Sequence, residues 1–425
     1  MIIRNFQSLS TNSTKKDALS IIEAGLAAAN PKIHLEKIIK KNALILPGRK
    51  VSLGKYRHVF VIATGKAGHT MAHAVDSLTH VDGGIIVVPA KVKMMDKKFK
   101  VIQAGHPIPN KNSLVAAKTI LEFLDKTDSE DLIIFLVSGG TSSLVALPDG
   151  ITLDEKRTTT DLLIKSGANI QEINCIRKHL SKIKGGKMLE HIRSDSISLV
   201  MSDVVGDDLS SIASGMTYYD KTTFAQAKKI LKKYHIERLV PKSVSSHLDL
   251  GIQGKIPETP KKGKIRNYII ATNNDCLDAM KLRAKGLGYS SRVITGITGD
   301  VQDLSYDVVR TFSGKKMNCV IFGGESTVVV TGKGKGGRNQ ELVLHCITDL
   351  SRKKKNAVVV SVGTDGIDGV TNCAGAIWQS DMKIGKIQPY LDKNNSYGFF
   401  KKYGGLILTG VTGTNLMDIG VILRK

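Results

Sequence analysis

The feature that most constrains the fold is a recurring unit, in which a short apolar run rich in β-branched residues precedes a glycine-rich loop and a helical segment. In the first half the apolar runs span residues 57–63, 84–89, 131–137 and 196–201, and they recur at 268–272, 291–295 and 357–362. Runs of this length between helices are typical of a parallel sheet that is covered on both faces. The sequence therefore predicts an α/β fold, with a doubly wound, Rossmann-like parallel sheet in the first half.

The chain has 425 residues, too many for one ordinary hydrophobic core, so we expect more than one domain. Residues 249–267 are rich in Pro, Gly and Lys without a periodic pattern, which predicts an interdomain linker. We therefore expect an N-terminal α/β domain at 1–248 and a smaller mixed α/β domain at 268–425. Residues 14–46 have helical spacing, and the apolar runs 319–322 and 327–331 around Gly-Gly-Glu-Ser predict a hairpin.

The overall composition favours a cytoplasmic protein without membrane or nucleic-acid partners. No apolar run approaches the roughly 18 residues that a membrane-spanning helix needs, and no secretory signal is visible. The five cysteines are widely spaced without a CxxC pair, as expected in a reducing compartment. The net charge of +24 comes from scattered lysines with only 5% aromatic residues, so we interpret it mainly as a solvated surface. A basic nucleic-acid-binding protein stays an alternative, and a homodimer is left open.

Two loops after strands of the first half carry hydroxyl groups and a lysine. Ligands of parallel sheets bind at the carboxyl ends of the strands, where glycine-rich loops present backbone N–H groups to phosphates. Lys66 follows the first strand at the start of a helix, where the helix dipole disfavours a cation unless an anion is present. We predict Lys66 as a catalytic and substrate-binding residue. The loop after the 131–137 strand supplies nucleotide-phosphate candidates: Ser138, Gly139, Gly140, Thr141 and Ser142. A solvated lysine and a tight turn are the alternatives.

Carboxylates follow two further strands. Asp203 and Asp207 lie in SDVVGDD after the 196–201 strand, and Asp365 lies in GTDGIDG after the 357–362 strand. Mg²⁺ takes a few carboxylates together with water and substrate phosphates. We predict these three aspartates as metal candidates, with Asp203, nearest to its strand, also in a catalytic role. Helix capping and Asp-Gly turns are the alternatives.

The segment GKGKGGRN at residues 332–339 formally matches the dinucleotide fingerprint GxGxxG. However, the position twenty residues after Gly332 is Arg352, where that fingerprint needs an acid, and no Walker A sequence exists. Two lysines and Arg338 favour a phosphate group instead. We predict Gly334, Gly336 and Gly337 as phosphate-binding, and Arg338 as catalytic and substrate-binding together with Glu325 nearby. An NAD(P)H-dependent hydroxypyruvate reductase stays an alternative.

Eight segments in order resemble the glycerate 2-kinase family, also called the class II or MOFRL-type glycerate kinases. They are TGKAGHTMAHAV, AGHPIPNKNSLVAAK, VSGGTSSLVALP, INCIRKHLSKIKGGKM, MSDVVGDDLSSIASGMT, GGESTVVVTGKGKGGRNQELVL, VGTDGIDGVTNCAGA and TGVTGTNLMDI.

The resemblance implies a two-domain kinase of carbohydrate metabolism with its active site between the domains. It implies that ATP and Mg²⁺ are used to convert D-glycerate to 2-phosphoglycerate, with Lys66 and Arg338 as the family's catalytic lysine and arginine. Both residues lie in polar loops, so we expect their replacement to affect the chemistry and not the stability.

Overall fold

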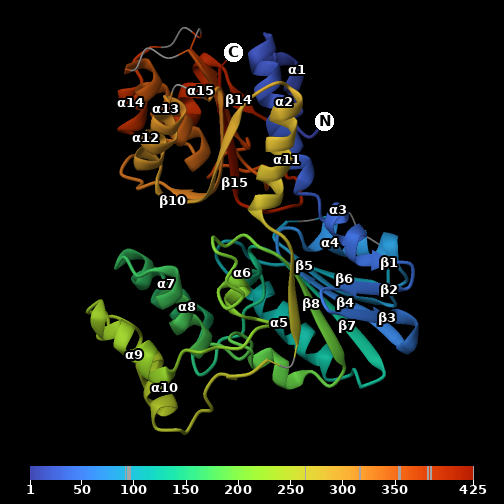
Figure 1. Cartoon of the computed structure of the whole chain (residues 1–425). Helices are drawn as coiled ribbons and strands as arrows, with labels where there is room; N and C mark the ends of the chain where they lie inside the picture. The colour runs from blue at the N-terminus through green and yellow to red at the C-terminus, as the bar shows by residue number, and fades with distance from the viewer. Residues whose placement is uncertain are drawn as a thin grey trace. The chain divides into compact units, whose positions relative to one another are not determined.

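The computed structural model describes residues 1–90, 92, 97–263, 265–314, 317–352, 356–380, 382 and 385–424. They form two compact units (Figure 1). We call residues 31–270 the parallel-sheet unit, and residues 1–30 together with 271–425 the mixed-sheet unit. The predicted α/β class, with a parallel sheet followed by a mixed one, is confirmed.

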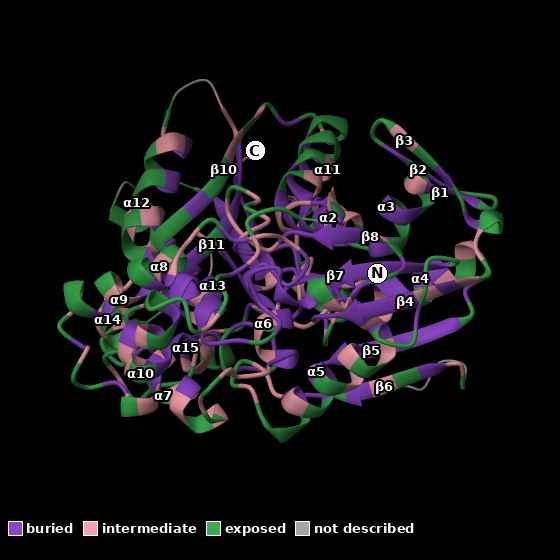
Figure 2. Ribbon diagram, turned by 90° about the horizontal axis from the view of Figure 1, so that it is seen from below, coloured by how far each residue is buried: buried purple, intermediate pink, exposed green. Residues whose placement is uncertain are grey.

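The parallel-sheet unit is built on six strands in the order β6-β5-β4-β7-β8-β9. Their bounds are β4 (His58–Thr64), β5 (Gly83–Val88), β6 (Phe99–Gln103), β7 (Asp131–Val137), β8 (Asp195–Met201) and β9 (Arg266–Ala271). From β6 to β8 every neighbouring pair is parallel. The strand residues are mostly buried (Figure 2), as the continuous apolar runs predicted.

The strand order reverses direction between β4 and β7, and this reversal positions the candidate site. Helix α4 (Gly68–Leu78) leads from β4 outward to β5, whereas α5 (Lys111–Leu124) leads from β6 back to β7. Right-handed crossovers in opposite directions place α4 and α5 on opposite faces of the sheet. On the α5 face, Ala116 and Ile120 share a hydrophobic cluster with Phe135 of β7. In such sheets ligands bind outside the carboxyl ends of the strands at the reversal.

Four further helices of this unit have a hydrophobic cluster of their own. They are α7 (Leu153–Lys165), α8 (Ile170–His179), α9 (Phe224–Lys233) and α10 (Lys242–Ile252), joined by buried side chains such as Ile176, Phe224 and Leu248. The unit begins with α3 (Pro31–Ile38) and a small antiparallel sheet of β1 (Ile39–Lys40), β2 (Ala43–Leu46) and β3 (Arg49–Ser52). Short helices α6 (Thr141–Leu144), η1 (Leu53–Lys55), η2 (Lys187–His191) and η3 (Ile212–Ser214) complete it.

The mixed-sheet unit has six strands in the order β10-β11-β15-β12-β13-β14. Their bounds are β10 (Ser291–Asp300), β11 (Cys319–Thr327), β12 (Val358–Gly363), β13 (Gly375–Gln379), β14 (Leu406–Ile407) and β15 (Asp418–Leu423). Among the described strands of this sheet, β10 and β11 alone pair in parallel. The C-terminal strand β15 lies between β11 and β12, antiparallel to both.

Helices cover the mixed sheet on two faces. Helices α12 (Val301–Phe312) and α13 (Arg338–Arg352) share a hydrophobic cluster with Phe322 and Ile422. Helices α2 (Ser13–Ala28) and α11 (Asn273–Gly286) pack together on the other face. A Cβ on Gly25 of α2 would lie 2.8 Å from side-chain atoms of both Ile419 and Met280, so glycine allows this close packing. The short helices α1 (Phe6–Leu9), α14 (Gln388–Leu391) and α15 (Ser396–Tyr403) complete this unit.

The division of the chain differs from the predicted one of 1–248, 249–267 and 268–425. Residues 1–30 belong with the C-terminal half, because the apolar face of α2 is buried on α11 and β15. The expected linker is also largely part of the parallel-sheet unit. Thr259 is buried, the Pro260 carbonyl accepts the Asp220 N–H, and the chain then enters β9. One linker residue, 264, lies outside the described residues.

The predicted hairpin at 319–331 is wrong. The segment Gly-Gly-Glu-Ser continues a single strand, β11, instead of turning. A Cβ on Gly324, which has φ +147°, would lie 2.2 Å from the Ile297 carbonyl oxygen, at an irregularity in the register with β10. Glycine is therefore needed here because two strands approach each other closely. In sequence, such a glycine pair looks the same as one that marks a turn.

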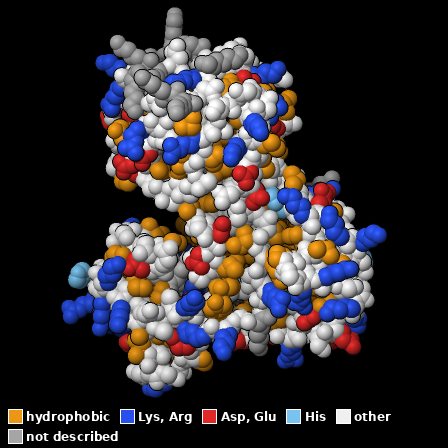
Figure 3. Space-filling model, in the orientation of Figure 1, with side chains coloured by type: hydrophobic (Ala, Val, Ile, Leu, Met, Phe, Trp, Pro, Cys, Tyr) orange, Lys and Arg blue, Asp and Glu red, His pale blue; other side chains and the backbone are white. Residues whose placement is uncertain are grey.

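No described helix combines the length and apolar character needed to span a bilayer. Lysine and arginine side chains are spread over the face shown in Figure 3 and do not gather in one stripe. All five cysteines are buried free thiols.

Candidate active site

The loop that carries Lys66 is hydrogen-bonded to the loop after the neighbouring strand. Thr64 and Val137 are register partners at the ends of β4 and β7, so the residues that follow them meet. The Lys66 N–H donates to the Gly139 carbonyl at 2.8 Å, and the Ala67 N–H donates to Ser138 Oγ at 3.0 Å. Lys66 and the predicted loop Ser138–Ser142 are thereby brought together at the reversal of the strand order.

Close approach between these two loops requires glycine. Gly65 has φ +114°, and a Cβ there would lie 2.2 Å from Ser138 Oγ. Gly140 has φ +87°, and a Cβ there would lie 2.9 Å from the His106 ring and 3.5 Å from Lys66 Cγ. The Lys66 and His106 side chains therefore both pass over the bare backbone of Gly140.

The hydroxyl groups of this loop have different surroundings. Ser138 and Thr141 are fully buried, and Thr141 Oγ1 donates to the Ser138 carbonyl at 2.7 Å and lies 3.0 Å from Thr64 Oγ1. These two side chains hold the loop in shape. Ser142 is half-buried, and its hydroxyl contacts that of Ser214, which in turn donates to Asn174 Oδ1 at 3.0 Å. Of the predicted side chains, Ser142 has the position best suited to a ligand.

The aspartates after β8 are not equivalent. Asp203 is half-buried immediately after the strand. Asp207 has φ +55° at the turn that follows. Asp208 accepts Ser210 N–H at 3.0 Å and Ser211 Oγ at 2.7 Å, so it stabilises the next turn. Burial alone would raise the pKa of Asp208, but these hydrogen bonds outweigh it and lower the pKa. Asp203 therefore remains the candidate of this segment.

Arg338 begins α13 in the mixed-sheet unit and is held by two carboxylates. Its Nε and Nη2 donate to the two oxygens of Asp418 at 2.5 and 3.0 Å, and its Nη1 lies 3.1 Å from Glu325 Oε1. The predicted neighbours Arg338 and Glu325 are thus brought together. Burial would lower the pKa of Arg338, but the charges of Asp418 and Glu325 keep it above its usual range. The guanidinium is therefore permanently charged and fixed in orientation.

Asp418 is a residue that the sequence-based reasoning missed. It is 3% exposed at the start of β15, and it also accepts Asn339 Nδ2 at 2.9 Å. Its only sequence signal is its place in TGTNLMDI, a segment quoted for the family resemblance but given no role.

The GTDGIDG segment contacts the first turn of α13, the helix that begins with Arg338. Asp368 is 1% exposed and accepts the backbone N–H groups of Asn339 and Gln340 at 3.0 and 2.9 Å. Burial raises the pKa of Asp368 to about 6, although these hydrogen bonds oppose the rise. Asp368 thus caps α13 and holds Arg338 at the first turn. Asp365 is half-buried, and its Oδ1 accepts the Ile367 N–H at 3.0 Å, as in an Asp-Gly turn.

The glycines of the GxGxxG match pack against the protein itself. A Cβ on Gly334, Gly336 or Gly337 would lie 2.4 Å from Lys393 O, 2.1 Å from Ser396 Oγ and 2.3 Å from Asp368 Cγ, respectively. The Gly334 N–H donates to the Lys393 carbonyl at 2.7 Å. These contacts explain the three glycines without a ligand. The loop also follows a strand of a mixed sheet, which is not the βαβ setting of a dinucleotide fingerprint.

No group of three metal-ligating side chains is assembled within the described part of the chain. Asp203 and Asp207 lie in the parallel-sheet unit, whereas Asp365 lies in the other unit. The arrangement therefore offers single carboxylates, as magnesium sites completed by substrate phosphates do.

A surface hollow of about 460 Å³ lies elsewhere, at the amino ends of the parallel strands. It is lined by Lys55, Tyr56, Arg57, Ser129, Glu130 and Asp195. Arg57 pairs with Glu130 at 2.5 Å, and Tyr56 OH donates to Asp195 at 2.6 Å. Because its charges are paired and it lies at the opposite edge from the expected ligand side, we do not assign it a catalytic role.

Comparison with known proteins extends over almost the whole chain. Residues 17–249 match the family described as "Domain of unknown function (DUF4147)", and residues 318–418 match the "MOFRL family". A glycerate 2-kinase of Pyrococcus horikoshii is 38% identical over 427 residues, which cover 95% of this chain and 96% of that protein. A crystal structure of a glycerate kinase from Thermotoga maritima has a TM-score of 0.82 at 33% identity, covering 96% of this chain and 99% of the other. A relative from Agrobacterium vitis, 34% identical over 430 residues covering 95% of this chain and 93% of that protein, carries a provisional name as a hydroxypyruvate reductase.

Proposed function

This chain belongs to the glycerate 2-kinase family, and from that membership we propose that it transfers the γ-phosphoryl group of ATP to O2 of D-glycerate, giving 2-phosphoglycerate. The observation that carries the proposal is the 38% identity with a glycerate 2-kinase over 95% of this chain. A shared fold alone would not suffice, because one fold hosts many activities. The buried free thiols fit a reducing, cytoplasmic compartment.

We assign Lys66 to the transferring phosphoryl group. In phosphoryl transfer the protein mainly positions the reactants and neutralises charge that spreads over the phosphoryl oxygens. Lys66 lies at the reversal of the strand order, over Gly140, with its backbone fixed by the hydrogen bond to Gly139. This fixed backbone supports a role for its ammonium group as a point charge beside the reacting phosphate.

We assign the loop from Ser138 to Ser142 to the phosphates of ATP. The buried hydroxyls of Ser138 and Thr141 are satisfied within the loop, so its shape does not depend on a ligand. The half-buried Gly140 and Ser142 supply the backbone and hydroxyl donors on the ligand side.

Arg338 acts as an oriented anion receptor. A guanidinium has five N–H donors in a rigid fork, and three of them are directed at Asp418 and Glu325. The remaining donors point from a fixed plane, which suits bidentate recognition of a carboxylate or a phosphate. We propose that they bind the glycerate carboxylate or the γ-phosphate. Gly334, Gly336 and Gly337 then shape the loop before Arg338 and need not touch phosphate.

Mg²⁺ needs few protein ligands, because this ion keeps several waters and binds the phosphate oxygens of the substrate. The single carboxylate of Asp203 is therefore a suitable protein ligand for it. When bound, it would neutralise phosphate charge during transfer. Asp203 would hold it directly or orient the glycerate hydroxyl. Asp207 and Asp365 are the secondary metal candidates.

The proposal is tested by incubating the chain with D-glycerate, ATP and Mg²⁺, and identifying the first product by NMR. We expect 2-phosphoglycerate. If 3-phosphoglycerate forms first, the chain carries the chemistry of another glycerate kinase class and the proposal fails.

The provisional name of the Agrobacterium vitis relative makes hydroxypyruvate reduction the second candidate. Absorbance at 340 nm with hydroxypyruvate and NADH or NADPH tests it. The packing of Gly334, Gly336 and Gly337 against neighbouring residues counts against a dinucleotide site there.

A further inference from the structure

Three cations converge in the interior of the parallel-sheet unit without an acidic partner. Lys156 of α7 is 7% exposed, Lys184 before η2 is 1% exposed, and Arg177 of α8 is half-buried. Among the residues that the structure describes, no carboxylate lies within 4 Å of their charged nitrogens, and Lys184 Nζ has no hydrogen-bond partner. Buried lysines are almost always paired, so this arrangement is not that of an ordinary core.

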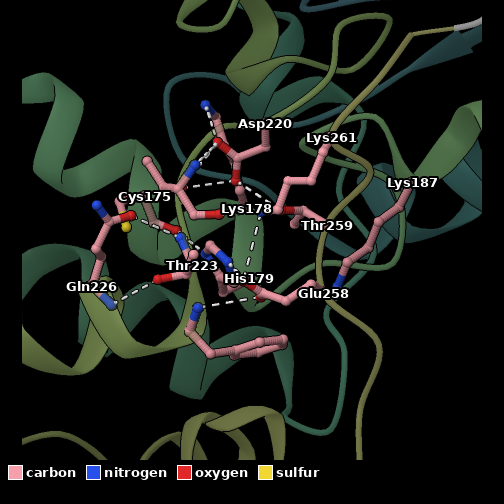
Figure 4. A network of polar contacts seen from close by, with 12 residues as sticks. Cys175, Lys178, His179, Lys187, Asp220, Thr223, Gln226, Glu258, Thr259 and Lys261 are labelled. Carbon is pink, nitrogen blue, oxygen red and sulfur yellow. Dashed lines mark hydrogen bonds and ion pairs between the residues drawn. The ribbon is translucent and has the colours of Figure 1, made fainter. Parts of the chain in front are cut away.

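Two carboxylates of this unit are already paired with other lysines, and Figure 4 shows the pair of Asp220 with Lys178. Asp220 pairs with Lys178 at 3.2 Å and also accepts the Thr222 and Thr259 hydroxyls. Asp149 lies 3.6 Å from Lys187. Lys156, Arg177 and Lys184 are therefore the basic groups of this interior that have no carboxylate partner among the described residues.

Burial lowers the pKa of each of these three basic groups. Burial, reinforced by the charges of Arg177 and Lys187, lowers the pKa of Lys156 to about 7. Burial, followed by the charges of Lys156 and Arg177, holds the pKa of Lys184 well below its usual range. Burial lowers the pKa of Arg177 as well. An anion among them would remove this repulsion.

The backbone that carries Lys184 is fixed to an unusual turn. The Gly185 N–H donates to the Ser214 carbonyl at 3.1 Å, and the Gly186 N–H donates to the Gly215 carbonyl at 2.8 Å. Ala213 and Ser214 have φ of 53° and 54°, a left-handed conformation that is costly for side chains other than glycine. Such strain is typical of functional sites.

Ser214 connects this cluster to the loop that we assign to ATP phosphates. Its hydroxyl contacts Ser142 and donates to Asn174 Oδ1. Asn174 and Arg177 are three residues apart on α8 and therefore share a face of that helix. The cluster and the Ser138–Ser142 loop thus form one continuous region of the parallel-sheet unit.

We propose that Lys156, Arg177 and Lys184 form a binding site for the polyphosphate of the nucleotide substrate, with Arg177 as the contacting donor and the two lysines as supporting charges behind it. This inference rests on the proposed kinase function. Three cations suit the several charges of a triphosphate better than the single charge of the glycerate carboxylate. Arg177 is the most accessible of the three, and its planar fork suits phosphate oxygens.

Tripolyphosphate and ATP, each without glycerate, are titrated into the protein by calorimetry. Arg177→Gln should weaken tripolyphosphate binding by about 10-fold or more, the scale of one charge-assisted hydrogen bond. Lys184→Met should weaken it as well, through the loss of a supporting charge. The matched control is Lys165→Met, on the same helix as Lys156, since Lys165 is 72% exposed and pairs with Asp161 on the surface. The control should bind as the wild type does.

Lys184→Met separates a binding role from a structural one. Methionine removes a buried amine that has no hydrogen-bond partner among the described residues and that is costly to desolvate, so the ligand-free variant should melt at a higher temperature than the wild type. A lower melting temperature together with wild-type tripolyphosphate binding would overturn the proposal. If Lys184→Met fails to fold, Arg177→Gln decides alone.

Other outcomes distinguish this site from the kinase function. Equal tripolyphosphate affinity in the wild type and in Arg177→Gln would refute the site even if the wild type phosphorylates glycerate. Displacement of tripolyphosphate by glycerate would also refute it, because the cluster would then bind the carboxylate. If the variants lose tripolyphosphate binding while the wild type makes no phosphoglycerate, the site stands and the proposed acceptor is wrong.

Discussion

Asp418 is the residue on which the orientation of Arg338 depends, so Asp418→Asn tests the organisation of the mixed-sheet unit. The carboxylate accepts Arg338 Nε at 2.5 Å, Arg338 Nη2 at 3.0 Å and Asn339 Nδ2 at 2.9 Å. Asparagine keeps one acceptor oxygen and presents an NH₂ group in place of the other. That NH₂ group would face an N–H of Arg338, and the compensating negative charge would be lost.

The expected magnitude follows from burial. Removing one partner of a fully buried ion pair costs about 3–5 kcal/mol. The Arg338 side chain is 34% exposed and can be partly solvated, so we expect the free energy of unfolding to fall by about 2 kcal/mol. In a protein unit of this size that corresponds to a decrease in Tm of about 4–8 °C. Because a displacement of about 1 Å at a reacting group can cost about 10²-fold, we expect kcat to fall by about that factor.

Thermal melting without ligand and steady-state kinetics with D-glycerate and ATP measure the two effects. Glu325→Gln is the matched control, because Glu325 is 47% exposed and makes one contact with Arg338, so its loss should cost less than about 1 kcal/mol. In an Arg338→Ala background, Asp418→Asn should not lower kcat further. Unchanged kcat in the single variant, or multiplied effects in the double variant, would refute the positioning role.

Three further substitutions test other parts of the molecule. Lys66→Ala should lower kcat by about 10³-fold with little change in Tm, and near-normal kcat/KM would exclude its catalytic role. Asp203→Asn should raise the Mg²⁺ concentration needed for half-maximal activity, and an unchanged requirement would transfer the metal role to Asp207 or Asp365. Burial raises the pKa of Asp368 from the ordinary value of 3.8 to about 6. Between these two values the folded state binds more protons than the unfolded state, so the stability of the wild type should fall as the pH rises from about 4 to 6. Asp368→Asn should remove that part of the pH dependence in urea unfolding, and identical profiles for both proteins would contradict the assignment.

The proximity of the Lys66 loop and the Ser138 loop can be predicted from the sequence because its causes are local. Each candidate loop directly follows an apolar strand, and parallel pairing of β4 with β7 places Thr64 beside Val137. The pairing of these two strands is therefore enough to predict that Lys66 and Ser138 lie close together. Lys156 of α7 and Arg177 of α8 follow no strand and lie in no glycine-rich loop, so no sequence pattern marks them. Basic residues are common in this chain, and the burial of these two depends on how α7 and α8 pack.

The mixed-sheet unit is harder to predict because its key contacts are distant in sequence. Arg338 and Asp418 are separated by 80 residues, and they meet because the last strand of the chain lies between β11 and β12. The expectation that Arg338 can be removed without loss of stability does not follow from this structure. Arg338→Ala would leave the buried carboxylate of Asp418 without its partner.

Glycine-rich loops in the two units have different physical causes, and this difference limits what a motif can predict. Gly65 and Gly140 have positive φ and let the Lys66 and Ser138 loops approach each other, which leaves backbone and side-chain donors at the carboxyl edge of the sheet. Gly334 and Gly336 instead make room for the chain at residues 393–396. A pattern of glycines records only that a Cβ is excluded. The atoms that exclude the Cβ decide between a phosphate site and a packing contact. Packing explains the glycines of the mixed-sheet loop, so the anion-binding role that we propose for this loop rests on Arg338.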